Sequence, residues 1–107
     1  MPTPLLALST CPNAETAAGI ARVLVEERLA ACVNRVPDIA STYRWQDQIH
    51  DDAEVLLLIK TTRERFDALR ERLTELHPYA VPDLIALDIA GGHPPYLEWL
   101  ARETASP

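Results

Sequence analysis

The sequence contains few of the residues that usually form metal clusters or membrane spans. It has two cysteines, Cys11 and Cys32, and neither has a second thiol at zinc-knuckle or redox-motif spacing, which excludes those two kinds of site. No apolar run approaches the roughly 20 residues that a membrane-spanning helix needs. Residues 1–4 lack the basic start and long apolar stretch of a signal peptide. We therefore expect a protein of the cytoplasm with no membrane partner.

Positive charge is also scarce. The chain has 10 basic residues against 16 acidic ones, a formal net charge of -6, and Lys60 is its single lysine. A negative field repels phosphate backbones, so we expect no nucleic-acid partner. An apolar fraction of 48% is typical of a globular chain, and 107 residues lie near the most common size of one domain. We therefore expect one domain over residues 1–107.

The first half of the chain predicts a strand, a helix and a second strand. Residues 4–9 form a short apolar run before a Thr-Cys-Pro-Asn break, which is typical of a buried strand ended by a turn. Pro12 and Asn13 can open a helix, and apolar residues then recur at helical spacing to near residue 29. From Ala31 to Trp45 the pattern changes to period two, which indicates a long strand.

A proline interrupts this long strand. Proline cannot donate to a sheet ladder, so Pro37 predicts a bulge or an edge crossing within one bent strand. Residues 46–48 then predict a hairpin turn, in which Asp47 tolerates a left-handed backbone. Residues 54–60 are almost wholly apolar and predict a returning central strand, while residues 50–52 are expected in a solvated loop after the turn.

The second half predicts a helix, a strand and a short terminal helix. Thr61 and Glu64 have capping-box spacing at the start of an apolar helical stripe, which His77 and the following proline end. Residues 83–89 alternate like a fourth strand. Two glycines turn the chain, and a pair of prolines can occupy the start of a last helix, after which residues 103–107 are expected to fray.

The order of these elements is β-α-β-β-α-β with an added C-terminal helix. This is the split βαβ arrangement of an α+β, ferredoxin-like sandwich, with a long hairpin between its second and third strands. Helices cover one face of such a sheet. The hairpin carries Tyr43 and Trp45, and a monomer would expose that aromatic surface. We therefore expect the chain to form an oligomer with itself.

Several short motifs occur together in a fixed order. They are Ala30-Ala31-Cys32-Val33-Asn34, Ser41-x-Tyr43-x-Trp45, Glu54, Lys60-Thr61, His77-Pro78-Tyr79 with Pro82, and Tyr96-Leu97-x-Trp99. In order and spacing they resemble the CutA divalent-cation-tolerance family over nearly the whole chain. The resemblance implies a ferredoxin-like homotrimer in which long hairpins pair with neighbouring subunits. It also implies a cytoplasmic protein associated with tolerance of copper and other divalent metals.

The expected metal ligands are His77, Cys11 and Asp83, because imidazole, thiol and carboxylate hold the softer transition metals. His77 occupies the family's His-Pro-Tyr motif at a helix end, although an imidazole there also suits capping of the last helical carbonyls. Some family members carry Cys at the position of Ser9. Cys11 would face the same way as Ser9 if the first strand continued that far.

Other candidate ligands have simpler interpretations. Cys32 matches the family's Ala-Cys-Val-Asn motif, but a strand cysteine is usually a small buried hydrophobe. His50, Asp51 and Asp52 place an imidazole beside two carboxylates, which suits either a loosely bound cation or a solvated loop. His93 follows two glycines without a phosphate-binding pattern and indicates a turn.

A ligand-binding surface is expected around Lys60, Glu54 and Tyr79. Lys60 matches the family's Lys-Thr pair, and its ammonium suits an anionic ligand or a carboxylate of a neighbouring subunit. Glu54 is six residues earlier, on the same side of a regular strand. Tyr43, Trp45 and Trp99 are expected at the trimer interface, where aromatic residues are enriched.

Two functions follow from these residues. The first is a homotrimeric protein that binds copper or another divalent cation in the response to metal ions. The alternative is a signalling module like the trimeric PII proteins, which would bind a small anionic ligand in clefts between subunits; this rests on analogy of fold. The sequence contains no Ser-His-Asp order, no nucleophile elbow and no organic-cofactor motif, so we expect no enzymatic turnover.

Overall fold

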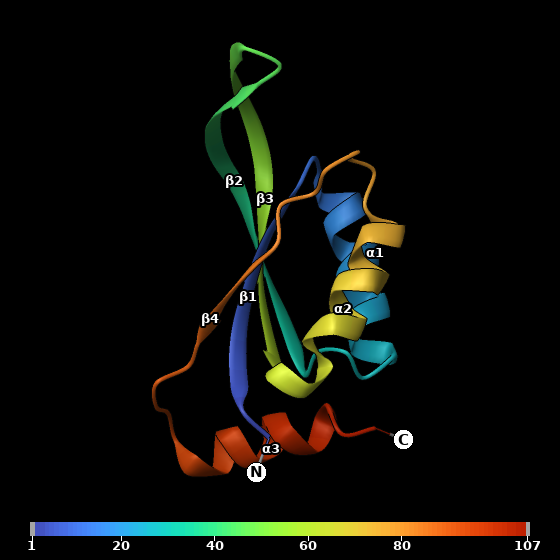
Figure 1. Ribbon diagram of the computed structural model, residues 1–107, viewed down its shortest axis with the longest axis vertical. Coiled ribbons are helices and arrows are strands. Elements are labelled where there is room, and N and C mark those ends of the chain that lie inside the picture. The colour runs from blue at the N-terminus through green and yellow to red at the C-terminus, as the bar shows by residue number, and fades with distance from the viewer. Residues whose placement is uncertain (1, 107) are drawn as a thin grey trace.

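The computed structural model, which describes residues 2–106, contains one antiparallel sheet of four strands and three helices. In chain order the elements are β1 (Pro4–Cys11), α1 (Ala14–Glu26), β2 (Cys32–Trp45), β3 (Gln48–Thr62), α2 (Arg63–Leu76), β4 (Ile85–Asp88) and α3 (Pro94–Glu103). The strands lie in the order β2-β3-β1-β4, and α1 and α2 cover one face of the sheet (Figure 1). The predicted α+β, ferredoxin-like arrangement with an added helix is confirmed.

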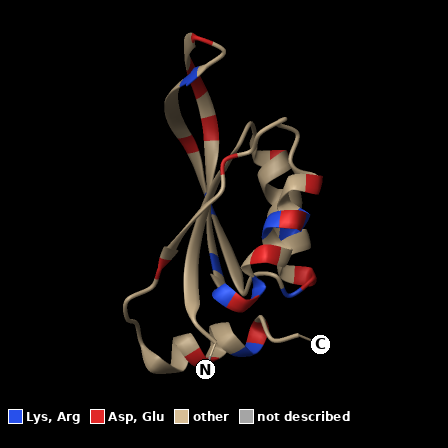
Figure 2. Ribbon diagram, in the orientation of Figure 1, with Lys and Arg blue, Asp and Glu red and all other residues tan. Residues whose placement is uncertain are grey.

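The core lies between the sheet and these two helices. Every second residue of β1, beginning at Leu5, is buried, as the period of a strand requires when one face is covered. No residue of β1 carries a charge, while charged side chains occur on the helices and along the hairpin (Figure 2). The core residues are Ala7, Cys11, Ala17, Ile20, Leu24, Leu29, Ala30, Val55, Leu57, Ile59, Leu69 and Leu73.

The two long helices begin differently. Asn13 caps α1, because its side chain accepts a hydrogen bond of 2.8 Å from the backbone N–H of Thr16. The capping box expected at α2 is wrong: Thr62 is the N-cap, and its side chain makes no capping bond. Glu64 instead accepts a bond of 3.0 Å from the backbone N–H of Thr3. That bond lowers the pKa of the Glu64 carboxyl.

The predicted hairpin forms between β2 and β3. Trp45 pairs with Gln48, and the two residues between them, Gln46 and Asp47, have φ values of 51° and 63°. Two positive φ values match the right-handed twist of hairpin strands, so this tight turn keeps the strands paired. The hairpin extends well beyond the helices, and the molecule is 44 Å long (Figure 1).

The irregularity predicted at Pro37 is confirmed. The pairing of β2 with β3 shifts register between Val36 and Ile39. Asp38 lies within the shift and has a φ of 60°, a conformation that short polar side chains tolerate better than branched ones. The bulge therefore separates the half of the hairpin that belongs to the sheet from the half that projects.

Strand β3 begins at Gln48, earlier than the sequence indicates. The expectation of a loop at residues 50–52 is wrong, since His50 pairs with Tyr43, and the two acidic residues that follow also lie in register with β2. Pairing with the opposite strand outweighs the poor strand propensity of the two aspartates. These polar side chains therefore lie along a strand face at defined spacing.

The ends of two elements, β1 and α3, also differ from expectation. Strand β1 continues through Thr10 to Cys11, so Cys11 and Ser9 do face the same side of the strand. Helix α3 continues through Glu103, and Thr104 is buried, with its hydroxyl donating a 2.8 Å bond to the carbonyl of Leu100. Fraying therefore does not begin at residue 103, and Pro107 lies outside the described residues.

The face of the sheet opposite α1 and α2 is largely apolar. Leu6 pairs with Leu87, and Leu8 with Ile85, so these four side chains share that face. Ile85 and Leu87 are 58% and 48% exposed, and they lie on the edge strand β4. The chain therefore leaves apolar surface uncovered. Within residues 2–106, no helix combines the length and the apolar character needed to cross a bilayer.

Candidate functional site

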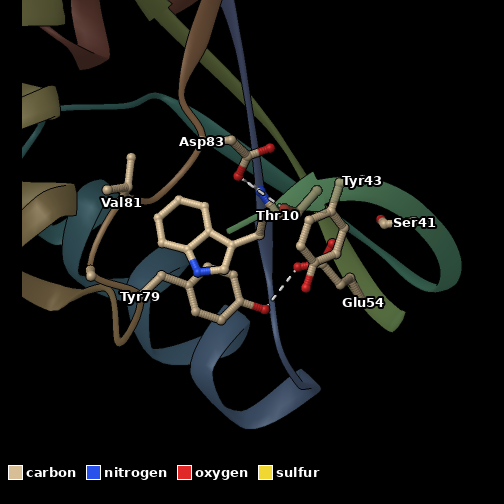
Figure 3. Close-up of a pocket in the computed structure, with 9 residues that line it drawn as sticks. Thr10, Ser41, Tyr43, Glu54, Tyr79, Val81 and Asp83 are labelled. Atoms are coloured by element: carbon tan, nitrogen blue, oxygen red, sulfur yellow. Dashed lines mark hydrogen bonds between the residues drawn. The ribbon is translucent and has the colours of Figure 1, made fainter. Parts of the chain in front are cut away.

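A pocket of about 450 Å³ lies where the end of β1, the hairpin and the loop between α2 and β4 meet (Figure 3). Five of the residues singled out in the sequence line it, although they were assigned there to three different roles. The lining residues are Thr10, Ser41, Tyr43, Trp45, Glu54, Tyr79, Ala80, Val81 and Asp83. The fold thus joins predicted metal, ligand and interface residues into one site.

One wall of the pocket is built on the pair Tyr79 and Glu54. The Tyr79 hydroxyl donates a hydrogen bond of 2.8 Å to Oε2 of Glu54, whose side chain comes from β3 (Figure 3). Glu54 is only 7% exposed. Burial, and then the bond to Glu54, raise the pKa of the Tyr79 phenol. The phenol therefore keeps its proton at neutral pH and acts as a donor.

Another part of the pocket wall is fixed by Asp83. Its Oδ1 accepts two bonds of 2.9 Å, one from the backbone N–H of Thr10 and one from the Thr10 hydroxyl (Figure 3). Its backbone carbonyl accepts a 2.7 Å bond from the hydroxyl of Ser9. Ser9 therefore has a structural role at the position where some family members have Cys, because it ties the loop before β4 to β1.

His77 is buried beneath this loop and uses both ring nitrogens. Its Nε2 lies 2.7 Å from the carbonyl of Thr10, which can only accept, and its Nδ1 accepts a 3.1 Å bond from the backbone N–H of Tyr79. The ring therefore carries its proton on Nε2. It holds the end of α2 against β1 and does not cap a helical carbonyl. A metal ion would have to displace one of these backbone partners.

Cys11 is fully buried in the core next to this site. Burial, reinforced by the negative charges of Asp83 and Glu54, raises the pKa of its thiol from 9.0 to about 11. The thiolate is the form that binds metals, so the thiol of this chain is a poor ligand at neutral pH. In the described part of the chain, no three His, Cys, Asp or Glu side chains are grouped so that they could hold a metal ion.

Lys60 lies far from the pocket. It is six residues from Glu54 along β3, about 20 Å at the rise of a strand. Its ammonium donates a hydrogen bond to Oδ1 of Asn34. Lys60 and Tyr79 therefore do not form one anion site within a single chain. Cys32 pairs with Lys60 across the strands and is half-buried.

The predicted interface aromatics lie in two places. Tyr43 stacks on His50, with ring centroids 5.3 Å apart, and its hydroxyl donates to Asp52, a bond that raises the pKa of the phenol. Trp45 is 45% exposed near the tip of the hairpin. Trp99 belongs instead to α3, where it packs 5.5 Å from Tyr96 and does not line the pocket.

Four lining residues were not anticipated as site residues: Thr10, Ser41, Ala80 and Val81. Ser41 could have been found, because period two places it on the same strand face as the aromatic residues of the hairpin. Thr10 and Val81 give no such signal, since they enter the pocket only through the path of β1 and of the loop before β4.

Comparisons with known proteins identify the family of the chain. A family model described as "CutA1 divalent ion tolerance protein" matches residues 5–103. The divalent-cation tolerance protein CutA of Thermus thermophilus is 55% identical over 97 residues, covering 91% of this chain and 94% of its own length. Protein CutA of Mus musculus is 49% identical over 94% of this chain, but the match spans only 56% of the mouse protein.

Solved structures show the same fold. The crystal structure of CutA from Xylella fastidiosa superposes with a TM-score of 0.94 at 47% identity, covering 96% of this chain and 99% of that one. Relatives differ in the compartment that their names give: one rice protein is called chloroplastic, and one from Archaeoglobus fulgidus is called periplasmic. Because the family model covers nearly all of the sequence and the relatives match it in both sequence and fold, the chain belongs to the CutA1 divalent ion tolerance family.

Proposed function

We propose that the protein acts in divalent-cation tolerance as a homotrimer that binds copper or another divalent cation in the cytoplasm, without catalytic turnover. The main support for this assembly is the apolar surface that one chain leaves uncovered. On the hairpin, Tyr43, Trp45 and Ile49 are 42%, 45% and 58% exposed, and β4 adds two more large apolar side chains. Surface of this kind is typical of a protein interface.

The sheet topology supports a closed ring. Strands β2 and β4 are the two edges of the sheet, and they lie on opposite sides of it. Each edge carries unpaired backbone groups that can pair with another strand. A contact between unlike edges of successive copies is heterologous, and it forms a ring when the rotation closes. That the ring contains three copies is inferred from the resemblance to the family.

We further propose that the cation is held by side chains of more than one copy. The predicted ligands His77 and Cys11 are committed within the chain, as described above, whereas Asp83 keeps one carboxylate oxygen without a hydrogen-bond partner among residues 2–106. The ring nitrogens of His50 make no hydrogen bond in the same residues, and the ring stacks on Tyr43 in the projecting hairpin. We therefore propose Asp83 and His50 as two ligands from this chain.

Light scattering coupled to size-exclusion chromatography tests the assembly. We expect a mass three times the 11.9 kDa of the chain. Leu87→Asp should lower the mass by placing a charge on the apolar edge strand. Val25→Asp is the matched control, because Val25 is 41% exposed but lies on helix α1 and not on an edge strand of the sheet. A monomeric wild type would contradict the proposal.

Calorimetric titration with Cu²⁺ and Zn²⁺ tests the cation site on protein of verified mass. We expect saturable binding that His50→Ala and Asp83→Asn each weaken by about tenfold or more, as the loss of one ligand should. His77→Ala should weaken binding less than either of these variants, because His77 supports the loop before β4 and is not one of the proposed ligands. Loss of binding in His77→Ala alone would move the site to that residue, and no binding by the wild type would remove metal binding from the proposal.

A further inference from the structure

The pocket beside the hairpin combines aromatic rings with carboxylates and contains no basic residue. Tyr43, Trp45 and Tyr79 supply three rings, and Glu54 and Asp83 supply two negative charges. Figure 3 shows Tyr43, Tyr79 and Glu54 converging from different elements on one space. Aromatic faces attract cations through their quadrupole, most strongly where water is excluded. Both kinds of wall therefore favour positive charge.

The hydrogen bonds along the wall leave mainly acceptors facing the pocket. The Tyr79 hydroxyl donates to Glu54, and the Thr10 hydroxyl donates to Asp83, so neither donor remains for a ligand. The hydroxyl of Tyr43 is likewise committed to Asp52. Of the side-chain donors that line the pocket, those of Ser41 and Trp45 have no partner among the described residues.

Both carboxylates keep an oxygen for a ligand. Oε1 of Glu54 has no hydrogen-bond partner within residues 2–106. No buried side-chain oxygen in those residues lacks a partner, so Oε1 must still touch open space. Oδ2 of Asp83 is free in the same sense, because both bonds from Thr10 reach Oδ1. A ligand that carries positive charge and N–H donors would complement both oxygens.

We propose that this pocket binds a small organic cation with N–H donors, such as an alkylammonium or an alkylguanidinium. Its volume of about 450 Å³ lies within the range of small-molecule sites, roughly 300–1,000 Å³. The charged head would contact Glu54 and Asp83, and the alkyl chain would lie against the rings. This site goes beyond the proposed metal function and requires no metal ion.

Without a ligand from a second copy, the pocket of one chain is a poor site for a metal ion. Calcium takes about six to eight oxygen ligands, and the pocket offers two free carboxylate oxygens. The softer transition metals prefer imidazole and thiolate, and neither a histidine nor a cysteine lines the pocket. Carboxylates among aromatic rings suit a cation whose charge is spread over a larger, partly apolar group.

Calorimetric or NMR titration of the wild-type assembly with n-butylammonium and n-butylguanidinium, in the presence of EDTA and at constant ionic strength, tests the proposal. Neutral n-butanol and anionic butyrate are probes of matched size. We expect saturable binding of both cations, at least about tenfold tighter than that of n-butanol, because the charge-assisted bonds are lost in the alcohol. Equal binding of n-butanol, or no saturation with either cation, would overturn the proposal.

Glu54→Gln and Glu71→Gln form the matched pair of variants. Both remove one negative charge, but Glu71 is exposed on α2 and does not line the pocket. We expect about tenfold weaker cation binding in Glu54→Gln and no change in Glu71→Gln. Asp83→Asn replaces Glu54→Gln if the latter does not assemble, since the amide oxygen can still accept from Thr10. Equal affinities in the pocket variant and in Glu71→Gln would refute the site.

The alternative occupant of the pocket is a lysine or arginine side chain of a second copy. In that case the cations would not bind the assembled wild type but would bind the dissociated Leu87→Asp chain. That result would overturn the proposal of a free small molecule. Binding to the wild-type assembly, with n-butylammonium leaving its mass unchanged, supports it. Because EDTA is present throughout, the result is independent of the metal titration.

Discussion

Replacing Cys11 with alanine should destabilise the protein at neutral pH and stabilise it at alkaline pH. In the folded chain the Cys11 thiol is buried, and burial with the charges of Asp83 and Glu54 raises its pKa from 9.0 to about 11. In the unfolded chain it ionises near pH 9. The unfolded state therefore loses a proton over a range in which the folded state keeps it.

The sign and size follow from proton linkage. Because the pKa of the thiol is higher in the folded chain, its contribution to the unfolding free energy is complete below pH 9 and is lost as the pH rises towards 11. Two pKa units correspond to about 2.7 kcal/mol of unfolding free energy. Deleting the sulfur also removes packing in the core, which costs roughly 1 kcal/mol at any pH. The wild-type residue should thus stabilise the protein by about 1 kcal/mol at pH 7.5 and destabilise it at pH 11.

The assay is urea denaturation followed by circular dichroism from pH 7.5 to 11. Both chains carry Cys32→Ala, so that Cys11 is the only thiol compared, and the protein concentration is fixed because assembly affects apparent stability. All other ionisable groups are shared by the two chains, so their contributions cancel in the difference. A difference between the two chains that does not change with pH would refute the reasoning.

Three further substitutions test the structure by urea denaturation. His77→Ala should lower the unfolding free energy by about 2 kcal/mol or more, because it leaves the Thr10 carbonyl and the Tyr79 N–H without their partners; a loss below about 1 kcal/mol would contradict this. Asp38→Val should be less stable than Asp38→Gly by about 1 kcal/mol or more, because a branched residue is strained at positive φ, and equal stabilities would argue against the bulge. Asn13→Ala should cost about 1 kcal/mol by removing the cap of α1, whereas Asn13→Ser should stay close to the wild type.

Most of the fold was predictable because its signals are local. The period of two in β2, the helical spacing in α1 and the turn at Asp47 each depend on residues that are close together in the chain. The bulge near Pro37 was predictable for the same reason, since a missing backbone N–H disturbs a sheet ladder wherever the strand lies. From these signals, the order of the elements and the ferredoxin-like fold follow.

The errors arise where distant residues decide the structure. The capping box at α2 does not form because Glu64 is bound by the backbone of Thr3, sixty-one positions earlier in the chain. The beginning of β3 was misplaced because His50, Asp51 and Asp52 look like a loop on their own and become a strand only through pairing with β2. Neither partner can be recognised from the local pattern.

The candidate site shows the same limit more sharply. The His-Pro-Tyr motif marked a functional region, and its tyrosine does line the pocket, but the role expected for His77 depended on a free ring nitrogen. The structure instead pairs that ring with the carbonyl of Thr10 on β1, 67 positions away in the chain. The motif indicated where the candidate site lies. It did not indicate that the imidazole supports the site from beneath, because this role depends on the contact with β1.

The pocket brings together residues that the sequence assigned to different functions, and the bulge in β2 explains this grouping. The bulge after Val36 releases the outer half of the hairpin from the plane of the sheet, so that Tyr43 and Trp45 come near the loop before β4. Glu54 pairs with Ile39, at the end of that same bulge, which is why a strand glutamate is buried beside Tyr79. A change that removed the bulge would therefore alter the aromatic and the acidic walls together, and it would do so without touching a lining residue.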